Sequence, residues 1–188
     1  MKGIKVTVFG RYVDFISKVQ SDSPHAVVTK TRLIKNQLIN YSVIKHGVRS
    51  GTKKESYILL SIESPVKPGS IDQKSTIGVI DFFGRSETSN FVSDLLSAKP
   101  NVKRVKKIED LLPLLSFNLV TCILIEKTNV SYFQNTSTIK FAITPLKFSD
   151  EDIIALAQKN GTSIPKTINF TKQSCDLIKS FFYVDKFE

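Results

Sequence analysis

The sequence contains few residues of the kinds that build metal sites and disulfide frameworks. Among 188 residues there are two cysteines and two histidines. Neither His25 nor His46 belongs to a group with metal-ligand spacing, and two cysteines are too few for a disulfide framework or a metal cluster. A membrane-spanning helix needs about eighteen consecutive apolar residues, and no apolar run in the sequence approaches that length. A metalloprotein, a disulfide scaffold and an integral membrane protein are therefore disfavoured.

The two cysteines have different surroundings in the sequence. Cys122 lies inside "LVTCILI", where a small apolar residue is expected, so we interpret it as part of the core. Cys175 lies on a helix-like segment near the end of the chain. A disulfide between Cys122 and Cys175 is left open by the sequence.

Local motifs of catalysis and nucleotide binding are also missing. There is no G-x-S-x-G elbow to support a catalytic serine, and "GVIDFFG" (78–84) does not fit the G-x-G-x-x-G fingerprint. A G-x-x-x-x-G-K-[ST] phosphate loop is absent as well. The sequence therefore predicts a protein that is not an enzyme and that has no cofactor.

The start of the sequence lacks the apolar segment of an export signal. Two interpretations follow from this. Either the protein is cytoplasmic, or an export signal has been removed from the chain.

The formal net charge is +10, and it is concentrated early in the sequence. Residues 1–54 contain 11 lysines and arginines against Asp14 and Asp22 only. Such an excess attracts anions, anionic surfaces or acidic proteins. The loop "KHGVRSGTKK" (45–54) is the best candidate for an anionic macromolecule, yet no aromatic stacking residues accompany it. We interpret "VKRVKK" (102–107) as the solvated edge of a strand, and a nucleic-acid partner is the less favoured prediction.

Hydrophobic periodicity predicts alternating strands and helices in the first part of the chain. The expected order is a strand at 4–9, a helix at 11–22, a strand at 25–29 and a helix at 30–39. Two further strands, 41–50 and 56–64, are expected to form a hairpin or to lie side by side. This order is typical of an α/β fold with a mostly parallel sheet.

The stretch 64–75 contains Pro65, Pro68 and Gly69 and is the clearest boundary in the sequence. The same alternation then resumes. Strands are expected at 76–83, 102–106, 119–126 and 139–145, and helices at 86–98, 108–118, 129–136, 149–160 and 170–182. We therefore predict lobe one from 1–64 plus 148–188, a linker at 65–75 and lobe two at 76–147.

Three segments carry a resemblance to a known family: "SPHAVVTKTRL", "STIGVIDFFGRSETSNFVSDLL" and "VKRVKKIEDLLPLLSFNLVTCILIEKTNVSYF". Their strand-to-helix pattern resembles the type II periplasmic solute-binding proteins, and most nearly the phosphate/phosphonate substrate-binding branch of bacterial ABC transporters. The resemblance implies a two-lobed α/β fold with mostly parallel sheets that captures a small anionic solute between its lobes. It also implies delivery of that solute to a membrane transporter or a sensor, in the periplasm or cell envelope if an export signal was removed.

One departure from the family pattern lies at the start of the chain. Family members carry another strand-helix unit ahead of the segment that matches "IKVTVFGRYVDF", and here that unit is missing or reduced. We therefore expect a first lobe that is smaller than usual. We also expect the protein to be a monomer.

The starts of two predicted helices supply the candidate ligand-binding residues. Unpaired N–H groups and the helix dipole favour an anion at such positions, and hydroxyl and guanidinium groups add hydrogen bonds. In lobe two the candidates are Arg85, Ser86, Thr88 and Ser89. In lobe one they are Thr29, Lys30 and Thr31. The hypothesis is that the two helix starts face each other across a cleft.

Ordinary helix capping explains the same hydroxyl groups without any ligand. Ser86 fits an N-cap position, and Thr29 likewise precedes a helix. Glu87 argues against a phosphate ligand, because its carboxylate would repel an anion. A zwitterionic ligand, a cationic ligand or no ligand at all would then be favoured.

Two other functions stay open at this point. In the first, the same fold has no ligand and docks an acidic protein or an anionic surface through its basic first lobe. In the second, a basic protein binds nucleic acid, for which charge is the sole support.

Overall fold

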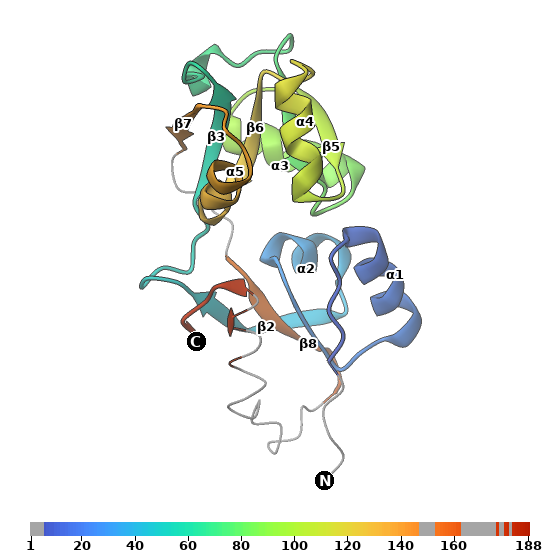
Figure 1. Ribbon diagram of the computed structural model, residues 1–188. Coiled ribbons are helices and arrows are strands. Elements are labelled where there is room, and N and C mark those ends of the chain that lie inside the picture. The colour runs from blue at the N-terminus through green and yellow to red at the C-terminus, as the bar shows by residue number, and fades with distance from the viewer. Residues whose placement is uncertain (1–5, 147–152, 163–175, 177–178, 181) are drawn as a thin grey trace. The chain divides into compact units, whose positions relative to one another are not determined.

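The computed structural model describes residues 6–146, 153–162, 176, 179–180 and 182–188 (Figure 1). The chain forms two compact units. Unit 1 consists of Met1–Asp22 and Tyr57–Lys147, and unit 2 consists of Ser23–Ser56 and Phe148–Glu188. In the described part of the chain, no helix combines the length and apolarity needed to cross a membrane.

Unit 1 is built on a five-stranded mixed sheet with the strand order β5-β4-β6-β3-β7. Strand β4 runs parallel to β5 and to β6, whereas β3 runs antiparallel to β6 and to β7. The strands are β3 (Tyr57–Ile62), β4 (Thr76–Ile80), β5 (Asn101–Val105), β6 (Cys122–Glu126) and β7 (Phe141–Pro145).

Helices lie on both faces of this sheet (Figure 1). These are α3 (Arg85–Leu96), α4 (Leu111–Ser116) and α5 (Val130–Thr136). Unit 1 also contains α1 (Tyr12–Asp22) and the short 3-10 helices η1 (Pro68–Ser70), η2 (Ile108–Asp110) and η3 (Lys127–Asn129). Helices α4 and α5 cover one face, where Leu111, Leu115 and Phe133 pack on β3 and β6. Helix α3 covers the opposite face, where Phe91 contacts the rings of Tyr57 and Phe83.

Unit 2 contains a four-stranded sheet in the order β1-β8-β2-β9, and every neighbouring pair in it is antiparallel. The strands are β1 (Ala26–Thr29), β2 (Tyr41–Val48), β8 (Ala155–Lys159) and β9 (Lys186–Phe187), and helix α2 (Thr31–Gln37) follows β1. Because β1 and β2 both run opposite to β8, they are parallel to each other on its two sides. Strand β8, from near the end of the chain, is thus inserted between β1 and β2 of a β1-α2-β2 unit.

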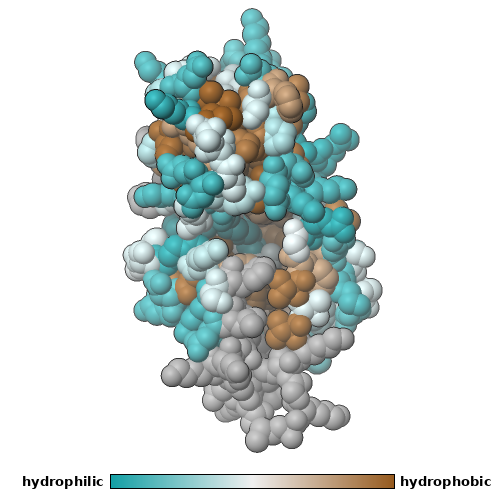
Figure 2. Space-filling view, viewed as in Figure 1, coloured by the Kyte–Doolittle hydropathy of each residue, from teal (hydrophilic) through white to brown (hydrophobic). Residues whose placement is uncertain are grey.

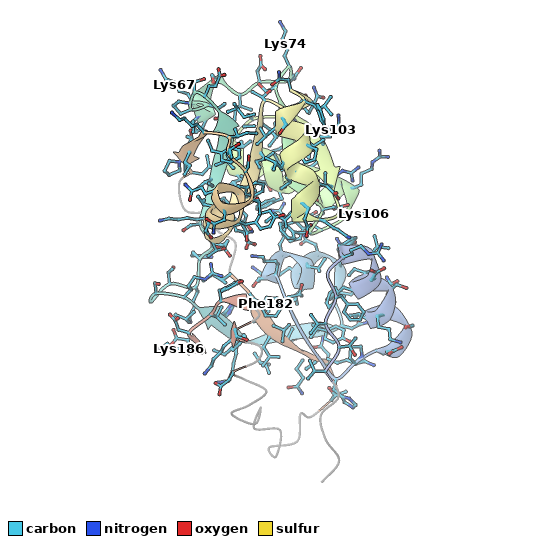
Figure 3. All side chains as sticks on the ribbon, viewed as in Figure 1. Lys67, Lys74, Lys103, Lys106, Phe182 and Lys186 are labelled. Atoms are coloured by element: carbon cyan, nitrogen blue, oxygen red, sulfur yellow. The ribbon has the colours of Figure 1, made fainter. Side chains whose placement is uncertain are left out.

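Most of the predicted elements are confirmed within a few residues of their bounds. The helix expected at 86–98 is α3, and the strand expected at 119–126 is β6, a buried apolar strand. The run 102–107 forms edge strand β5 and the residues after it, and Lys103 and Lys106 are exposed there (Figure 3). The prediction of a solvated basic edge is therefore confirmed.

The prediction of mostly parallel sheets is wrong. Among the described strand pairs, β4–β5 and β4–β6 are parallel and the other five are antiparallel. The reason is long-range insertion. Strand β8 returns from the end of the chain to lie between β1 and β2, and β3 lies between β6 and β7.

Two local predictions are also wrong. The helix expected at 149–160 is strand β8 where it is described, because Ile153 to Ala157 form an apolar run that is at most 3% exposed between two strands. A strand was expected at 4–9, but its described residues are not in a strand, and Val6 and Val8 are about half exposed. The helix expected at 170–182 lies mostly outside the described residues.

The expected pairing of 41–50 with 56–64 does not occur, since β2 belongs to unit 2 and β3 belongs to unit 1. The units accordingly differ from the predicted lobes. The chain passes between units at residues 56 and 57 rather than within 65–75, because β3 pairs with β6 and β7. Residues 1–22 also belong to unit 1.

This division changes the interpretation of the charge. Unit 1 has 15 basic and 10 acidic side chains, and unit 2 has 12 basic and 7 acidic side chains. Each unit therefore carries a formal charge of +5. The visible surface of each unit mixes hydrophilic residues with small apolar areas (Figure 2). The expected basic first lobe is not a separate body in the structure.

Gly78 in the centre of β4 has a close-packed environment. A Cβ at this position would lie 2.9 Å from Ile123 Cγ2 and 3.4 Å from Leu114 Cδ1. We expect Gly78→Ala to lower the free energy of unfolding by about 1–3 kcal/mol, because the sheet and α4 would have to separate slightly. Gly69→Ala, with open space at its Cβ position, should stay within about 0.5 kcal/mol of the parent. Urea denaturation of both variants tests the comparison, and equal stabilities would contradict it.

Cys122 is a free thiol that is 0% exposed on β6, and Cys175 lies outside the described residues. Burial raises the pKa of the Cys122 thiol to about 12. Because the thiolate is the reactive form, a Cys175→Ser variant should not react with Ellman's reagent at neutral pH while folded. Full reaction is expected in denaturant. Rapid labelling of the native protein would contradict the buried assignment.

Candidate functional site

Strands β4, β5 and β6 are parallel, so their carboxyl ends lie at the same end of the unit 1 sheet. After β4 the chain passes to α3 on one face. After β5 and β6 it passes to α4 and α5 on the other face (Figure 1). Where the connections after neighbouring parallel strands pass to opposite faces of a sheet, a crevice forms at the carboxyl ends of those strands. Ligands of open α/β sheets bind at such points. The turn from β4 to α3 is therefore the candidate site in unit 1.

Gly84 is the N-cap residue that precedes helix α3, and its φ is 83°. This conformation favours glycine. A Cβ at Gly84 would also lie 2.9 Å from the hydroxyl oxygen of Tyr12 on α1, so a larger residue would have to displace that side chain. The start of α3 is thus held against a second helix of the same unit.

Asp81 holds the turn together from the inside. Its Oδ1 accepts hydrogen bonds from the Gly84 N–H at 2.9 Å and from the Thr88 hydroxyl at 2.8 Å. The Thr88 oxygen in turn accepts a bond from the Phe83 N–H at 3.3 Å. Sequence reasoning missed Asp81, although an acid directly after a buried strand was a visible signal.

Thr88 is 0% exposed, and its hydroxyl is used within the protein. It is therefore a structural residue of the turn, and the expectation that it contacts a ligand is not supported by its position. Ser89 donates its hydroxyl hydrogen to the Arg85 carbonyl at 3.1 Å, one turn back along the helix. Of the four predicted residues of lobe two, Arg85 and Ser86 are the exposed ones.

Ser86 does not cap α3. The helix begins at Arg85, Gly84 occupies the N-cap position, and no side chain makes a capping hydrogen bond there. The capping explanation for Ser86 is therefore wrong. Its hydroxyl lies in the first turn, where backbone N–H groups have no partner within the helix.

Charges of both signs surround this helix start. Arg104 on β5 lies 3.9 Å from Asp81 through its Nη1 atom, and both side chains are more than three-quarters buried. Glu87 stands in the first turn beside Arg85. The two guanidinium groups are thus matched by two carboxylates, so the charge of the turn does not by itself favour a strongly charged anion.

In unit 2, Thr29, Lys30 and Thr31 are consecutive at the junction of β1 and α2. Thr29 ends the strand, Lys30 is the N-cap residue, and Thr31 begins the helix with 5% exposure. The N-cap side chain makes no capping bond. Thr29 therefore does not cap α2, and Thr31 is largely inaccessible.

The ammonium group of Lys30 pairs with Glu55, with 3.3 Å between Nζ and Oε2. Glu55 also pairs with Arg49, with 3.0 Å between Oε1 and Nη1, and it accepts the Ser56 N–H at 3.1 Å. The side chain of Glu55 is 1% exposed. Sequence reasoning missed this group as well, because the chain brings Lys30 and Glu55 together from 25 residues apart.

The structure thus brings the predicted residues together in two sets, one at the start of α3 and one at the start of α2. That the two sets face each other remains a prediction. Within the described residues, no group of three or more His, Cys, Asp or Glu side chains could hold a metal ion.

No protein-family model matches the sequence, and no curated protein matches it. Solved structures do share its fold. The periplasmic VFT2 domain of BvgS from Bordetella pertussis aligns with a TM-score of 0.58 at 13% identity, over 91% of this chain and 71% of that one. XAC2383 from Xanthomonas citri bound to ATP aligns with a TM-score of 0.66 at 9% identity, over 98% and 78%.

An amino acid ABC transporter substrate-binding protein from Streptococcus pneumoniae, bound to L-arginine, aligns with a TM-score of 0.54 at 12% identity, over 80% of this chain and 61% of that one. The mixed α/β fold of this chain is therefore similar to that of periplasmic binding proteins. At these identities the comparison concerns the fold alone, and the predicted phosphate/phosphonate branch has no support from it.

Replacing Thr88 tests the internal role of its hydroxyl. We expect Thr88→Val to lower the free energy of unfolding by about 1–3 kcal/mol, because Asp81 loses a donor and the Phe83 N–H loses its acceptor in a buried place. Ser89→Ala is the matched control and should change stability by less than about 0.5 kcal/mol. Chemical denaturation measures both. A Thr88→Val protein as stable as the parent would show that this hydroxyl is not needed for the turn.

Proposed function

We propose that this chain is a non-enzymatic solute-binding protein that captures a small anionic ligand and serves a membrane transporter or a sensor. Its location would be the periplasm or cell envelope, and a monomer would suffice for this role. The residues proposed to contact the ligand are Arg85 and Ser86 at the start of α3 in unit 1.

The observation that carries the proposal is the construction of the β4–α3 turn. Asp81 and Thr88 satisfy the inside of the turn, whereas Arg85 and Ser86 are exposed at the start of a twelve-residue helix. This helix start also lies where the connections of the sheet diverge. Helix amides, a hydroxyl and a guanidinium group at such a place suit an oxyanion.

The fold comparisons support a ligand-binding role in general. XAC2383 has been solved with ATP, which is an anion, and the Streptococcus pneumoniae protein with L-arginine. The latter is a substrate-binding protein of an ABC transporter. These ligands differ in charge, so they favour binding of a small solute without favouring phosphate.

An interaction module that docks acidic partners through a basic first lobe is less well supported. The basic residues of the early sequence are divided between the two units, and each unit has the same formal charge. Lys30 and Arg49, two of those basic residues, are paired with Glu55 inside unit 2.

Thermal shift with inorganic phosphate, methylphosphonate, sulfate and amino acids tests the proposal, because a ligand specific to the folded state raises Tm. We expect a shift with at least one anion. Arg85→Gln should weaken that ligand by about tenfold or more, because a charged hydrogen bond is lost.

Lys74→Gln removes the same charge from an exposed position at the amino end of β4 and is the matched control. Its affinity should equal that of the parent protein. Equal losses of affinity in both variants would show that the effect comes from net charge alone. The absence of a Tm shift with every anion tested would overturn the proposal.

A further inference from the structure

The end of unit 1 that lies opposite the β4–α3 turn exposes an aromatic side chain. Loops that lead into β4, β5 and β6 form this end, because the amino ends of parallel strands lie together. Phe117, directly after α4, is 74% exposed, and Leu119 is 48% exposed. Of the phenylalanines in the described part of the chain, Phe117 alone is neither buried nor half-buried. A ring left in water forgoes the stabilisation that burial would give it, so its position requires an explanation.

The backbone of residues 117–119, which we call the tip, is fixed to helix α4. Three consecutive N–H groups, those of residues 117, 118 and 119, donate to carbonyls within α4 at 3.0, 3.0 and 2.9 Å. Asn118 has a φ of 52°, the left-handed conformation that commonly ends a helix. Val120 follows at once and is 7% exposed. The exposure of Phe117 is therefore a property of a well-defined turn that is anchored on both sides.

The loops before β4 and β5 are hydrogen-bonded to one another and to the residues that follow the tip. The Thr121 N–H donates to the Thr76 carbonyl at 2.7 Å, and the Thr76 N–H donates to the Thr121 hydroxyl oxygen at 3.2 Å. Asn101 donates its N–H to the Ser75 carbonyl at 2.9 Å and its side-chain amide to the Gln73 carbonyl at 2.8 Å. The three loops therefore form one continuous surface at this end of the sheet.

Lysines outnumber acids on this surface. The exposed charged side chains of the loops and adjoining strand ends are Lys67, Lys74, Lys99, Lys103, Lys140, Glu63, Asp72 and Asp94. Lys67 and Lys74 lie at this end of the unit (Figure 3). Asp94 belongs to α3, on the face of the sheet opposite α4, and Asp72 accepts the hydroxyl hydrogen of Ser75 within its own loop. Five lysines against three acids leave the surroundings of the tip positive.

An apolar tip flanked by lysines suits an anionic lipid surface better than a protein surface. A stable protein interface buries about 800 Å² on each partner and is depleted in lysine, whereas one aromatic side chain supplies at most about 250 Å². At a bilayer surface the requirements are different. Aromatic and aliphatic side chains enter the interfacial region, and lysine ammonium groups meet the lipid phosphates.

We propose that this end of unit 1 docks on an anionic lipid bilayer, with Phe117 and Leu119 entering the interface and the flanking lysines contacting phosphate groups. Two side chains and a small positive charge give reversible rather than permanent attachment. In this orientation the carboxyl ends of β4, β5 and β6 point away from the membrane, and with them Arg85 and Ser86. The inference goes beyond the proposed function and does not depend on its ligand contacts.

Tryptophan is absent from the sequence, so Phe117→Trp places a single tryptophan at the tip. We expect its fluorescence to shift to shorter wavelength when vesicles of equal parts phosphatidylglycerol and phosphatidylcholine are added, and to be quenched by brominated lipid in them. Vesicles of phosphatidylcholine alone should give a much smaller change, and added salt should weaken the effect. Ile39→Trp, at a 76% exposed residue of unit 2, is the matched control and should not respond.

Sedimentation with the same vesicles measures what each group contributes. Phe117→Ser should weaken binding about tenfold, because burial of the ring is lost. Lys74→Gln should weaken it about fivefold, since a lysine near an anionic surface contributes attraction of that size. Ile39→Ser and Lys45→Gln change an exposed apolar residue and an exposed lysine of unit 2, and both should bind like the parent protein.

Three results would overturn the inference: no binding to the anionic vesicles, equal binding by the parent and Phe117→Ser, or a Phe117→Trp emission that the vesicles leave unchanged. Self-association that Phe117→Ser abolishes, measured by sedimentation equilibrium, would assign the tip to a second copy of the chain and would also overturn it. Because Phe117 is exposed, its variants should fold like the parent, which circular dichroism checks. Thermal shifts with small anions test the proposed function separately, so failure of docking leaves that function standing.

Discussion

Burial of the central strands on both faces is the constraint on which unit 1 depends. Strands β3, β4 and β6 lie between α3 on one side and α4 and α5 on the other, and residues such as Leu59, Ile77 and Ile123 are 0% exposed. Side chains of such strands must be apolar, so polar groups are confined to the strand ends. The chemistry of the unit is accordingly concentrated where β4 ends. Gly78 belongs to the same constraint, because a side chain there would meet α4 and β6.

Carboxylates organise both candidate regions from within. Asp81 fixes the turn before α3, and Glu55 fixes Lys30 before α2. In each region an acid reduces the positive charge that the sequence displays. Each region thus has well-positioned groups but only a moderate electric field. The charge balance, rather than the number of basic residues, therefore describes each region.

The interleaving of the two units explains why the order of residues in the sequence is a poor guide to the distribution of charge. The early basic stretch is divided after residue 22, so that residues 1–22 belong to unit 1 and residues 23–54 belong to unit 2. Residues from the end of the chain then complete unit 2, where Asp185 accepts a hydrogen bond from the Ser50 N–H. Counting charged residues along the sequence therefore assigns to different segments charges that the fold brings together in one unit.

The sequence by itself determined the elements whose signals are local. Helices α1 and α3 follow from apolar spacing, and β6 follows from a continuous apolar run, since these patterns reflect burial on one face or on both. Tertiary structure decided the rest. The run that forms β8 fits a buried helix as well as a buried strand, and only the gap between β1 and β2 selects the strand. Likewise, Arg85 could be named from the turn before a helix, whereas the pairing of Lys30 with Glu55 required the chain to fold, because contacts between distant residues leave no periodic trace in the sequence.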